Sequence, residues 1–135
     1  MPDILIDGST RHIFVVDDHS SSANLLAMLL KRAGHKVSVF YNAVDALHAL
    51  EQICPDVMFL DMEMPGLSGQ QALRQIRARP QNDHLKIVAL TAAEFGDELD
   101  GNDLAGFDHI LIKPADIEEI SRILASCGPV SSAEA

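Results

Sequence analysis

Five short apolar runs, separated by stretches with helical periodicity, place the strongest constraint on how this chain folds. They have the length and composition of buried strands, and they lie at residues 12–17, 36–40, 57–60, 86–90 and 109–112. Because strands and helices alternate through short loops, the pattern predicts a doubly wound α/β fold with a parallel sheet. We expect five strands in the order 2-1-3-4-5.

The stretches between the runs predict five helices, at residues 20–34, 42–52, 68–79, 94–105 and 116–126. We expect serines at the start of the first helix to serve as its N-cap, with Gly34 near its end. Asn42 and Ser68 are the expected N-caps of the second and third helices.

At 135 residues the chain has the size of one domain, which can bury about two thirds of the surface exposed by its unfolded form. We expect the domain at residues 11–126, an extension at 1–10, and a flexible tail or the start of a linker at 127–135. Cys54 and Cys127 have no metal-like spacing, and the start of the chain lacks signal-peptide character, so we expect a cytoplasmic protein.

The charge balance bears on the kind of partner. With 20 acidic and 10 basic residues, the net charge is −10. Nucleic-acid affinity comes largely from Lys and Arg that neutralise phosphates, so the composition argues against a nucleic-acid partner. No apolar stretch approaches the length of a membrane span, and we therefore expect no membrane partner.

Four of the apolar runs end in residues suited to phosphate chemistry, namely Asp17 with Asp18, Asp61, Thr91, and Lys113 followed by Pro114. Parallel strands share one carboxyl edge, where open α/β sheets place their sites, so these side chains are expected to converge. Adjacent acids repel each other and need a compensating positive charge. A hard cation that keeps several waters fits three carboxylates, and Mg²⁺ fits better than Zn²⁺.

Asp61 has two chemical interpretations: it binds the metal, or it attacks phosphorus to form an acyl phosphate. Phosphoryl transfer requires in-line positioning and neutralisation of the phosphoryl oxygens. Thr91 and Lys113 supply a hydroxyl and an ammonium for that purpose, although a Thr at a strand end also caps helices and a lone Lys is usually solvated.

Over residues 11–126 the chain resembles the receiver domain of two-component response regulators. The resemblance is carried by matched motifs in order: Asp17-Asp18, Asp61-Met62-Glu63-Met64-Pro65 through Gly69, Thr91-Ala92 and Lys113-Pro114. It implies a flavodoxin-like (βα)₅ fold. It also implies a phosphoprotein of signal transduction, with no enzymatic role beyond its own phosphorylation and dephosphorylation.

By this resemblance Asp61 is the phosphoacceptor, and the donor is a phosphohistidine on a sensor histidine kinase or a histidine phosphotransfer protein. The implied cofactor is Mg²⁺, bound by the side chains of Asp18 and Asp61, by Asp17 through water, and by the backbone carbonyl of Glu63.

The resemblance further implies that Lys113 pairs with the phosphoryl oxygens. Thr91 would move to hydrogen-bond the phosphate and shift the surface near it and the fourth helix, which is read by a downstream protein.

One position departs from the usual receiver pattern, and the side-chain direction at a second position is open. Ile110 stands three residues before the lysine, where receivers usually carry Tyr or Phe, so we expect little motion there on phosphorylation. The side chain of Glu63 either covers the site or points to solvent.

The first helix carries more apolar side chains than one buried stripe needs. Leu25 and Met28 fall outside the centre of that stripe, and we expect them to contact the histidine-bearing partner unless neighbouring elements cover them. We expect His19 beside the pocket at the surface, without a ligand role, because Mg²⁺ prefers oxygen.

Three rival functions remain. A Mg²⁺-dependent phosphatase with an aspartyl nucleophile, similar to the haloacid dehalogenase group, would carry a second Asp where Glu63 stands. A flavodoxin-like ligand module would need a phosphate loop after the first strand, where Asp17 and Asp18 repel phosphate. A receiver-like module that binds proteins without phosphorylation would not need the complete acidic set.

Overall fold

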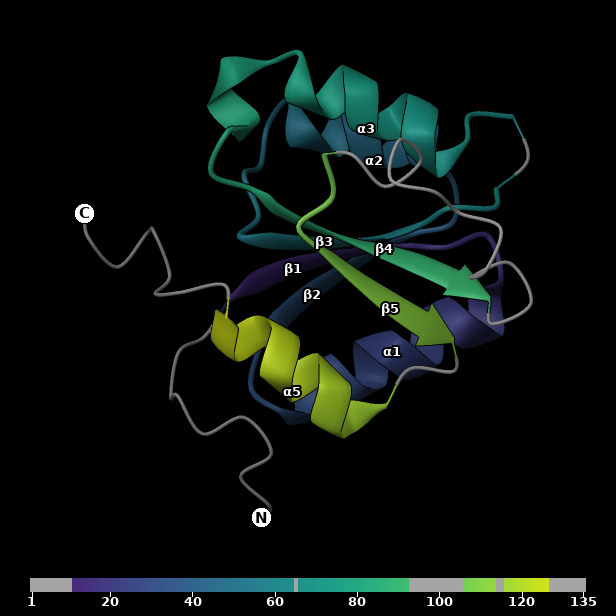
Figure 1. Cartoon of the computed structure of the whole chain (residues 1–135), viewed down its shortest axis with the longest axis vertical. Coiled ribbons are helices and arrows are strands. Elements are labelled where there is room, and N and C mark those ends of the chain that lie inside the picture. Colours follow the sequence, from purple (N-terminus) through teal and green to yellow (C-terminus); the bar gives the residue numbers. More distant parts are fainter. Residues whose placement is uncertain (1–10, 65, 93–105, 114–115, 127–135) are drawn as a thin grey trace.

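The computed structural model describes residues 11–64, 66–92, 106–113 and 116–126, and these form one five-stranded parallel sheet with its covering helices (Figure 1). The strand order is β2-β1-β3-β4-β5, as predicted. The strands are β1 (His12–Val16), β2 (Lys36–Phe40), β3 (Val57–Asp61), β4 (Lys86–Ala92) and β5 (His109–Lys113). The predicted fourth helix, the N-terminal extension and the C-terminal tail lie outside the described residues.

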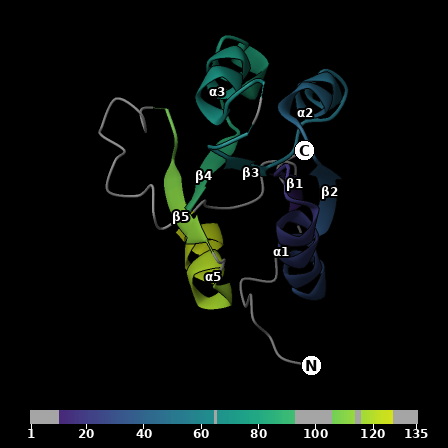
Figure 2. The same cartoon turned by 90° about the vertical axis from the view of Figure 1, so that its right-hand side faces the viewer.

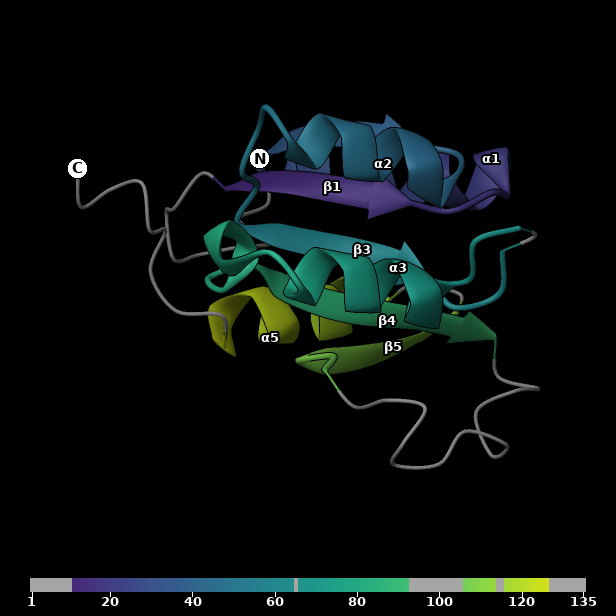
Figure 3. The same ribbon diagram turned by 90° about the horizontal axis from the view of Figure 1, so that it is seen from above.

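The strands end at slightly different positions from those predicted. β1 stops at Val16 instead of continuing to Asp17. The chain turns there, because the Asp17 side chain accepts a hydrogen bond from the backbone N–H of His19. β4 continues two residues farther than expected, because Thr91 and Ala92 pair with β5. Figure 3 shows the arrows of β1, β3 and β4 pointing the same way, so that their carboxyl ends share one edge.

The helices of the described residues form two layers. α2 (Ala43–Leu50) and α3 (Gly69–Arg77) cover one face of the sheet, and α1 (Ser20–Arg32) and α5 (Ile117–Ser126) cover the other (Figure 2). A short 3₁₀ helix, η1 (Pro80–Asn82), which was not predicted, follows α3. None of the helices in the described ranges is long and apolar enough to cross a membrane.

The helix N-caps follow the sequence in two cases out of three. Asn42 accepts from the N–H of Asp45, and Ser68 forms a capping box with Gln71, as their residue types predict. The expectation of a serine cap on α1 is wrong. The N-cap is His19, whose side chain makes no capping hydrogen bond, so the serines lie inside the first turn.

The core divides according to the two-residue alternation of the strands. In β1, Ile13 and Val15 face the α1 and α5 layer, whereas Phe14 and Val16 face α2 and α3. β3 divides in the same way. Because helices bury both faces of the sheet, these two strands are almost continuously apolar in sequence.

Arg77, at the end of α3, ties together segments at the amino edge of the sheet. Its guanidinium donates to the backbone carbonyls of Asn82, Leu85 and Gly106 at 3.2, 2.9 and 3.3 Å. It also donates to the Asp108 carboxylate at 2.9 Å. The same carboxylate accepts the backbone N–H of Ile87 at 2.8 Å, so one ion pair links α3, β4 and the start of β5.

Candidate functional site: an acidic cluster at the carboxyl edge

Two nearly inaccessible carboxylates lie side by side at the carboxyl edge of the two central strands. Val16 of β1 is in register with Leu60 of β3, so the next residues, Asp17 and Asp61, are neighbours. Each is only 1% exposed. The Asp61 Oδ1 accepts the backbone N–H of Glu63 at 3.0 Å, which fixes the carboxylate at the end of its strand.

Lys113 reaches both carboxylates from the end of β5. Its Nζ lies 2.9 Å from Asp17 Oδ2 and 3.3 Å from Asp61 Oδ2. The lysine side chain crosses the end of β4 to reach Asp61, and it crosses the ends of both β4 and β3 to reach Asp17. Burial would lower the pKa of Lys113, but its hydrogen bonds and charge contacts with both acids raise that pKa above its usual value.

Each of the two buried carboxylates shifts the pKa of the other. Burial and the adjacent Asp17 raise the pKa of Asp61 to about 7. Burial alone would raise the pKa of Asp17 as well, but hydrogen bonds from Asp61, from the His19 N–H and from Lys113 hold it below its usual value. Lys113 therefore offsets only part of the effect that burial and Asp17 have on the pKa of Asp61.

Asp18 supplies the observation that tests whether a cation fits here. Its Oδ1 is buried and accepts no hydrogen bond, with the His19 imidazole Nδ1 3.4 Å away, and buried oxygens without a hydrogen bond are uncommon. Ligand atoms of Asp17, Asp18, His19 and Asp61 all lie within 4.8 Å of one another. An excess of carboxylate oxygens with one unsatisfied atom matches the donor set of a hard divalent cation.

Thr91 and Glu63 lie next to this cluster. Thr91, fully buried at the end of β4, directly follows Leu90, which is in register with Asp61. Its Oγ1 has two acceptors within hydrogen-bond distance, the Ala92 backbone oxygen at 3.4 Å and the Glu63 Oε2 at 3.5 Å. The Glu63 side chain thus points toward Thr91, the first of the two orientations left open by the sequence.

Gly69 has a packing role that the motif alone did not explain. A Cβ at this position would lie 2.6 Å from the backbone oxygen of Asp61 and 2.9 Å from the Cα of Met62. Only glycine allows the first residue of α3 to approach the backbone this closely. The requirement depends on tertiary contact, so no local sequence signal reports it.

Three side chains singled out in the sequence are exposed: Leu25 and Met28, predicted to contact the partner, and Ile110, which stands where receivers usually carry an aromatic residue. Leu25 and Met28 are 51% and 52% exposed on α1, so neighbouring elements of the described structure do not cover them. Ile110 on β5 is 40% exposed. Among the described residues, these side chains form no part of the acidic cluster.

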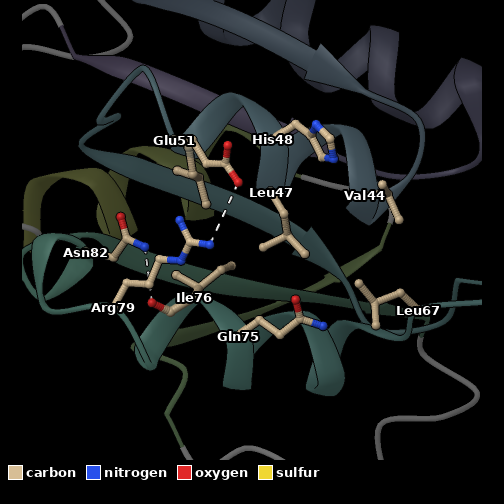
Figure 4. A pocket seen from close by; sticks show the side chains of 10 residues that line it. Val44, Leu47, His48, Glu51, Leu67, Gln75, Ile76, Arg79 and Asn82 are labelled. Carbon is tan, nitrogen blue, oxygen red and sulfur yellow. Dashed lines mark hydrogen bonds and ion pairs between the residues drawn. The ribbon is translucent and has the colours of Figure 1, made fainter.

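The molecule also has a hollow away from this edge, between α2 and α3 (Figure 4). Its volume is about 370 Å³, and an ion pair between Glu51 and Arg79 at 3.7 Å crosses one end. Leu47 and Ile76 contribute apolar walls. It brings together no group of carboxylates, so the acidic cluster remains the candidate site.

Relatives by sequence include proteins of similar and of much greater length. The chain is 33% identical over 112 residues to an uncharacterised 14.6 kDa protein of Leptolyngbya boryana, covering 83% of this chain and 86% of that protein. It is 29% identical over 126 residues to the sensor histidine kinase GacS of Pseudomonas protegens, covering 91% of this chain but only 14% of the kinase.

Solved structures share the fold. A CheY-like response regulator receiver domain from Methylobacillus flagellatus superposes with a TM-score of 0.81 at 31% identity, covering 89% of this chain and all of that one (100%). The receiver domain of sensor histidine kinase PA1611 from Pseudomonas aeruginosa superposes at 0.78 with 28% identity, covering 87% and 97%. That structure has a magnesium ion coordinated in its active-site cleft.

The family assignment agrees with the residues that form the cluster. The sequence pattern of the response regulator receiver domain matches residues 13–125, which include the acidic edge and all five strands except the first residue of β1. The resemblance seen in the sequence is confirmed. The chain belongs to the response regulator receiver domains of two-component signalling systems.

Proposed function

We propose that Asp61 accepts a phosphoryl group from a phosphohistidine of a sensor histidine kinase or of a histidine phosphotransfer protein. One observation carries the proposal: the Lys113 ammonium contacts both the Asp17 and Asp61 carboxylates, and a ligand atom of Asp18 lies within 4.8 Å of one from each of these two acids. This arrangement supplies a nucleophile, a fixed positive charge and an unsatisfied cation ligand at one point. Phosphoryl transfer requires such positioning and charge neutralisation.

In the proposed step a carboxylate oxygen of Asp61 attacks phosphorus. The phosphorus–nitrogen bond of the donor breaks, and the nitrogen keeps its electron pair. The product on this chain is an acyl phosphate. Lys113, already 3.3 Å from Asp61, then faces the added phosphoryl oxygens and neutralises part of their charge.

The proposed cofactor is Mg²⁺, held by the side chains of Asp18 and Asp61 and the backbone carbonyl of Glu63, with Asp17 as an outer carboxylate. When bound, the ion neutralises charge on phosphoryl oxygens and favours the ionised carboxylates. The raised pKa of Asp61 supports this role, because the nucleophile must lose its proton before it attacks.

The proposed switch is a change of partner for the hydroxyl of Thr91. In the structure its acceptors are the Ala92 backbone oxygen at 3.4 Å and the Glu63 carboxylate at 3.5 Å, both long for a hydrogen bond. A phosphoryl group on Asp61 offers a charged acceptor, and charge-assisted hydrogen bonds are stronger than neutral ones. Movement of Thr91 toward the phosphoryl group would alter the surface at the end of β4, where a downstream protein would bind.

The phosphoacceptor is tested by incubating the protein with Mg²⁺ and acetyl phosphate and measuring its intact mass. We expect one added phosphoryl group on the wild type, none on Asp61→Asn, and one on the matched control Asp83→Asn, which changes an exposed carboxylate. Chelation of the cation should prevent the addition. Phosphate release without any adduct would favour the phosphatase, and no adduct with either a kinase or acetyl phosphate would favour the phosphate-independent module.

The proposed donor contact on α1 makes a separate prediction. Leu25→Ser should slow transfer from a phosphorylated kinase or phosphotransfer protein by about tenfold, because it removes exposed apolar surface from the interface. Phosphorylation by acetyl phosphate should not change. Ile53→Ser, which alters another exposed apolar side chain, is the control and should transfer normally. Equal transfer by the wild type and Leu25→Ser would remove Leu25 from the interface.

A further inference from the structure

His19 occupies the N-cap of α1 without capping the helix. Ser, Thr, Asp or Asn at an N-cap accepts a hydrogen bond from a backbone N–H of the first turn, but the His19 side chain makes no such bond. Its Nδ1 instead lies 3.4 Å from Asp18 Oδ1 and 3.6 Å from Asp17 Oδ1. The imidazole is therefore placed against the acidic pair.

The spacing of these atoms is close to that of ligands around one ion. At a metal–ligand distance of about 2.1 Å, octahedral ligand atoms lie about 3.0 Å apart when adjacent and about 4.2 Å when opposite. One atom each from Asp17, Asp18, His19 and Asp61 fall within 4.8 Å of one another. Small side-chain rotations would close this difference, and the His19 side chain is 69% exposed.

The chemistry of the donor set indicates which cations would use the imidazole. Mg²⁺ is satisfied by oxygen ligands, whereas imidazole nitrogen suits the divalent ions of the first transition row. We propose that His19 Nδ1 joins the Asp18 and Asp61 carboxylates as a ligand of such an ion, so that this site selects transition-metal cations over Mg²⁺. The inference rests on the proposed cation site and adds a nitrogen ligand to it.

The backbone and the side chain of His19 make separate contacts, so the side chain can be replaced without loss of the backbone contact. The backbone N–H of His19 donates to Asp17 Oδ1 at 3.0 Å, and any non-proline residue keeps this bond. His19→Leu therefore removes the nitrogen ligand and leaves the turn into α1 in place. His84→Leu, which changes an exposed histidine before β4, is the matched control.

The test is pulsed electron paramagnetic resonance of Mn²⁺ bound to the purified protein. We expect nitrogen-14 coupling from a directly bound imidazole in the wild type and in His84→Leu, and none in His19→Leu. Titrations with Co²⁺ and Mg²⁺ should show a loss of Co²⁺ affinity of at least about tenfold in His19→Leu, with Mg²⁺ affinity changed less than about twofold.

Three results would overturn the inference: Mn²⁺ that does not bind, bound Mn²⁺ without nitrogen coupling in the wild type, and coupling that persists in His19→Leu. These outcomes are distinct from failure of the proposed function. The proposed function fails if Asp61 gains no phosphoryl group with Mg²⁺ and acetyl phosphate. That mass measurement does not depend on whether His19 binds a metal.

Discussion

Replacing Asp61 with asparagine is expected to raise the free energy of unfolding of the metal-free protein by about 2 kcal/mol at pH 8. The folded state raises the pKa of this carboxyl from 3.8 to about 7 through burial and the adjacent Asp17. Between these two values the folded protein holds a proton that the unfolded chain has released. Stability from this group is therefore present below pH 4, falls as the pH rises to about 7, and stays low above that.

Asparagine does not titrate, so the substitution removes the fall in stability that accompanies ionisation of Asp61. The expected gain is about half of what the pKa shift alone implies, because the Asp61→Asn variant would give up the charge contact with Lys113. Urea unfolding with chelator at pH 4 and pH 8 measures the effect. The difference between variant and wild type should be near zero at the lower pH and largest at the higher one.

Two comparisons make this result specific. Asp83→Asn removes an exposed carboxylate and should shift stability by less than about 0.5 kcal/mol at either pH. Saturating Mg²⁺ at about 100 times its dissociation constant should stabilise the wild type by about 2.7 kcal/mol and so reduce the advantage of the variant. A variant less stable than the wild type at pH 8 would show that Lys113 already compensates the pair.

Gly69→Ala is expected to destabilise the protein by about 3 kcal/mol, the larger of the two effects. Alanine normally favours a helix over glycine, but here its Cβ would lie 2.6 Å from the Asp61 oxygen and 2.9 Å from the Met62 Cα. Both atoms belong to the backbone, so relief requires movement of the chain that holds the proposed phosphoacceptor. Urea unfolding measures the loss of stability, and phosphorylation by acetyl phosphate should slow in the folded fraction.

Gly34→Ala is the matched control for this substitution. Gly34 has φ of +101°, and an added Cβ would meet nothing within 4 Å. The backbone conformation alone should make this change cost about 1 kcal/mol. Equal losses at the two positions would mean that α3 moves away from Asp61 without strain.

The sequence predicts the parts of this protein that depend on local patterns. Strand positions follow from apolar runs that are buried on both faces, and the caps at Asn42 and Ser68 follow from their own side chains. The convergence of Asp17, Asp61 and Lys113 follows from the strand order, because topology alone brings the strand ends to one edge.

The features that escaped prediction depend on contacts between distant segments. The serine cap predicted for α1 is wrong because His19 takes the N-cap position, with its imidazole against Asp18 instead of the helix. The close approach at Gly69 arises only when α3 packs on the backbone after Asp61. The extra length of β4 comes from its pairing with β5, a partner that lies beyond residues 93–105 in the sequence.

The ion pair between Arg77 and Asp108 has a consequence for Lys113 at the other end of β5. Asp108 is the last residue before β5, and its contacts with Arg77 and the Ile87 N–H fix where that strand begins beside β4. A slip of one residue would turn every side chain of the strand to the opposite face. Lys113 would then no longer reach Asp61. The contacts of Asp108 at the amino edge of the sheet thus help to fix the register that brings Lys113 to the acidic cluster, about one strand length away.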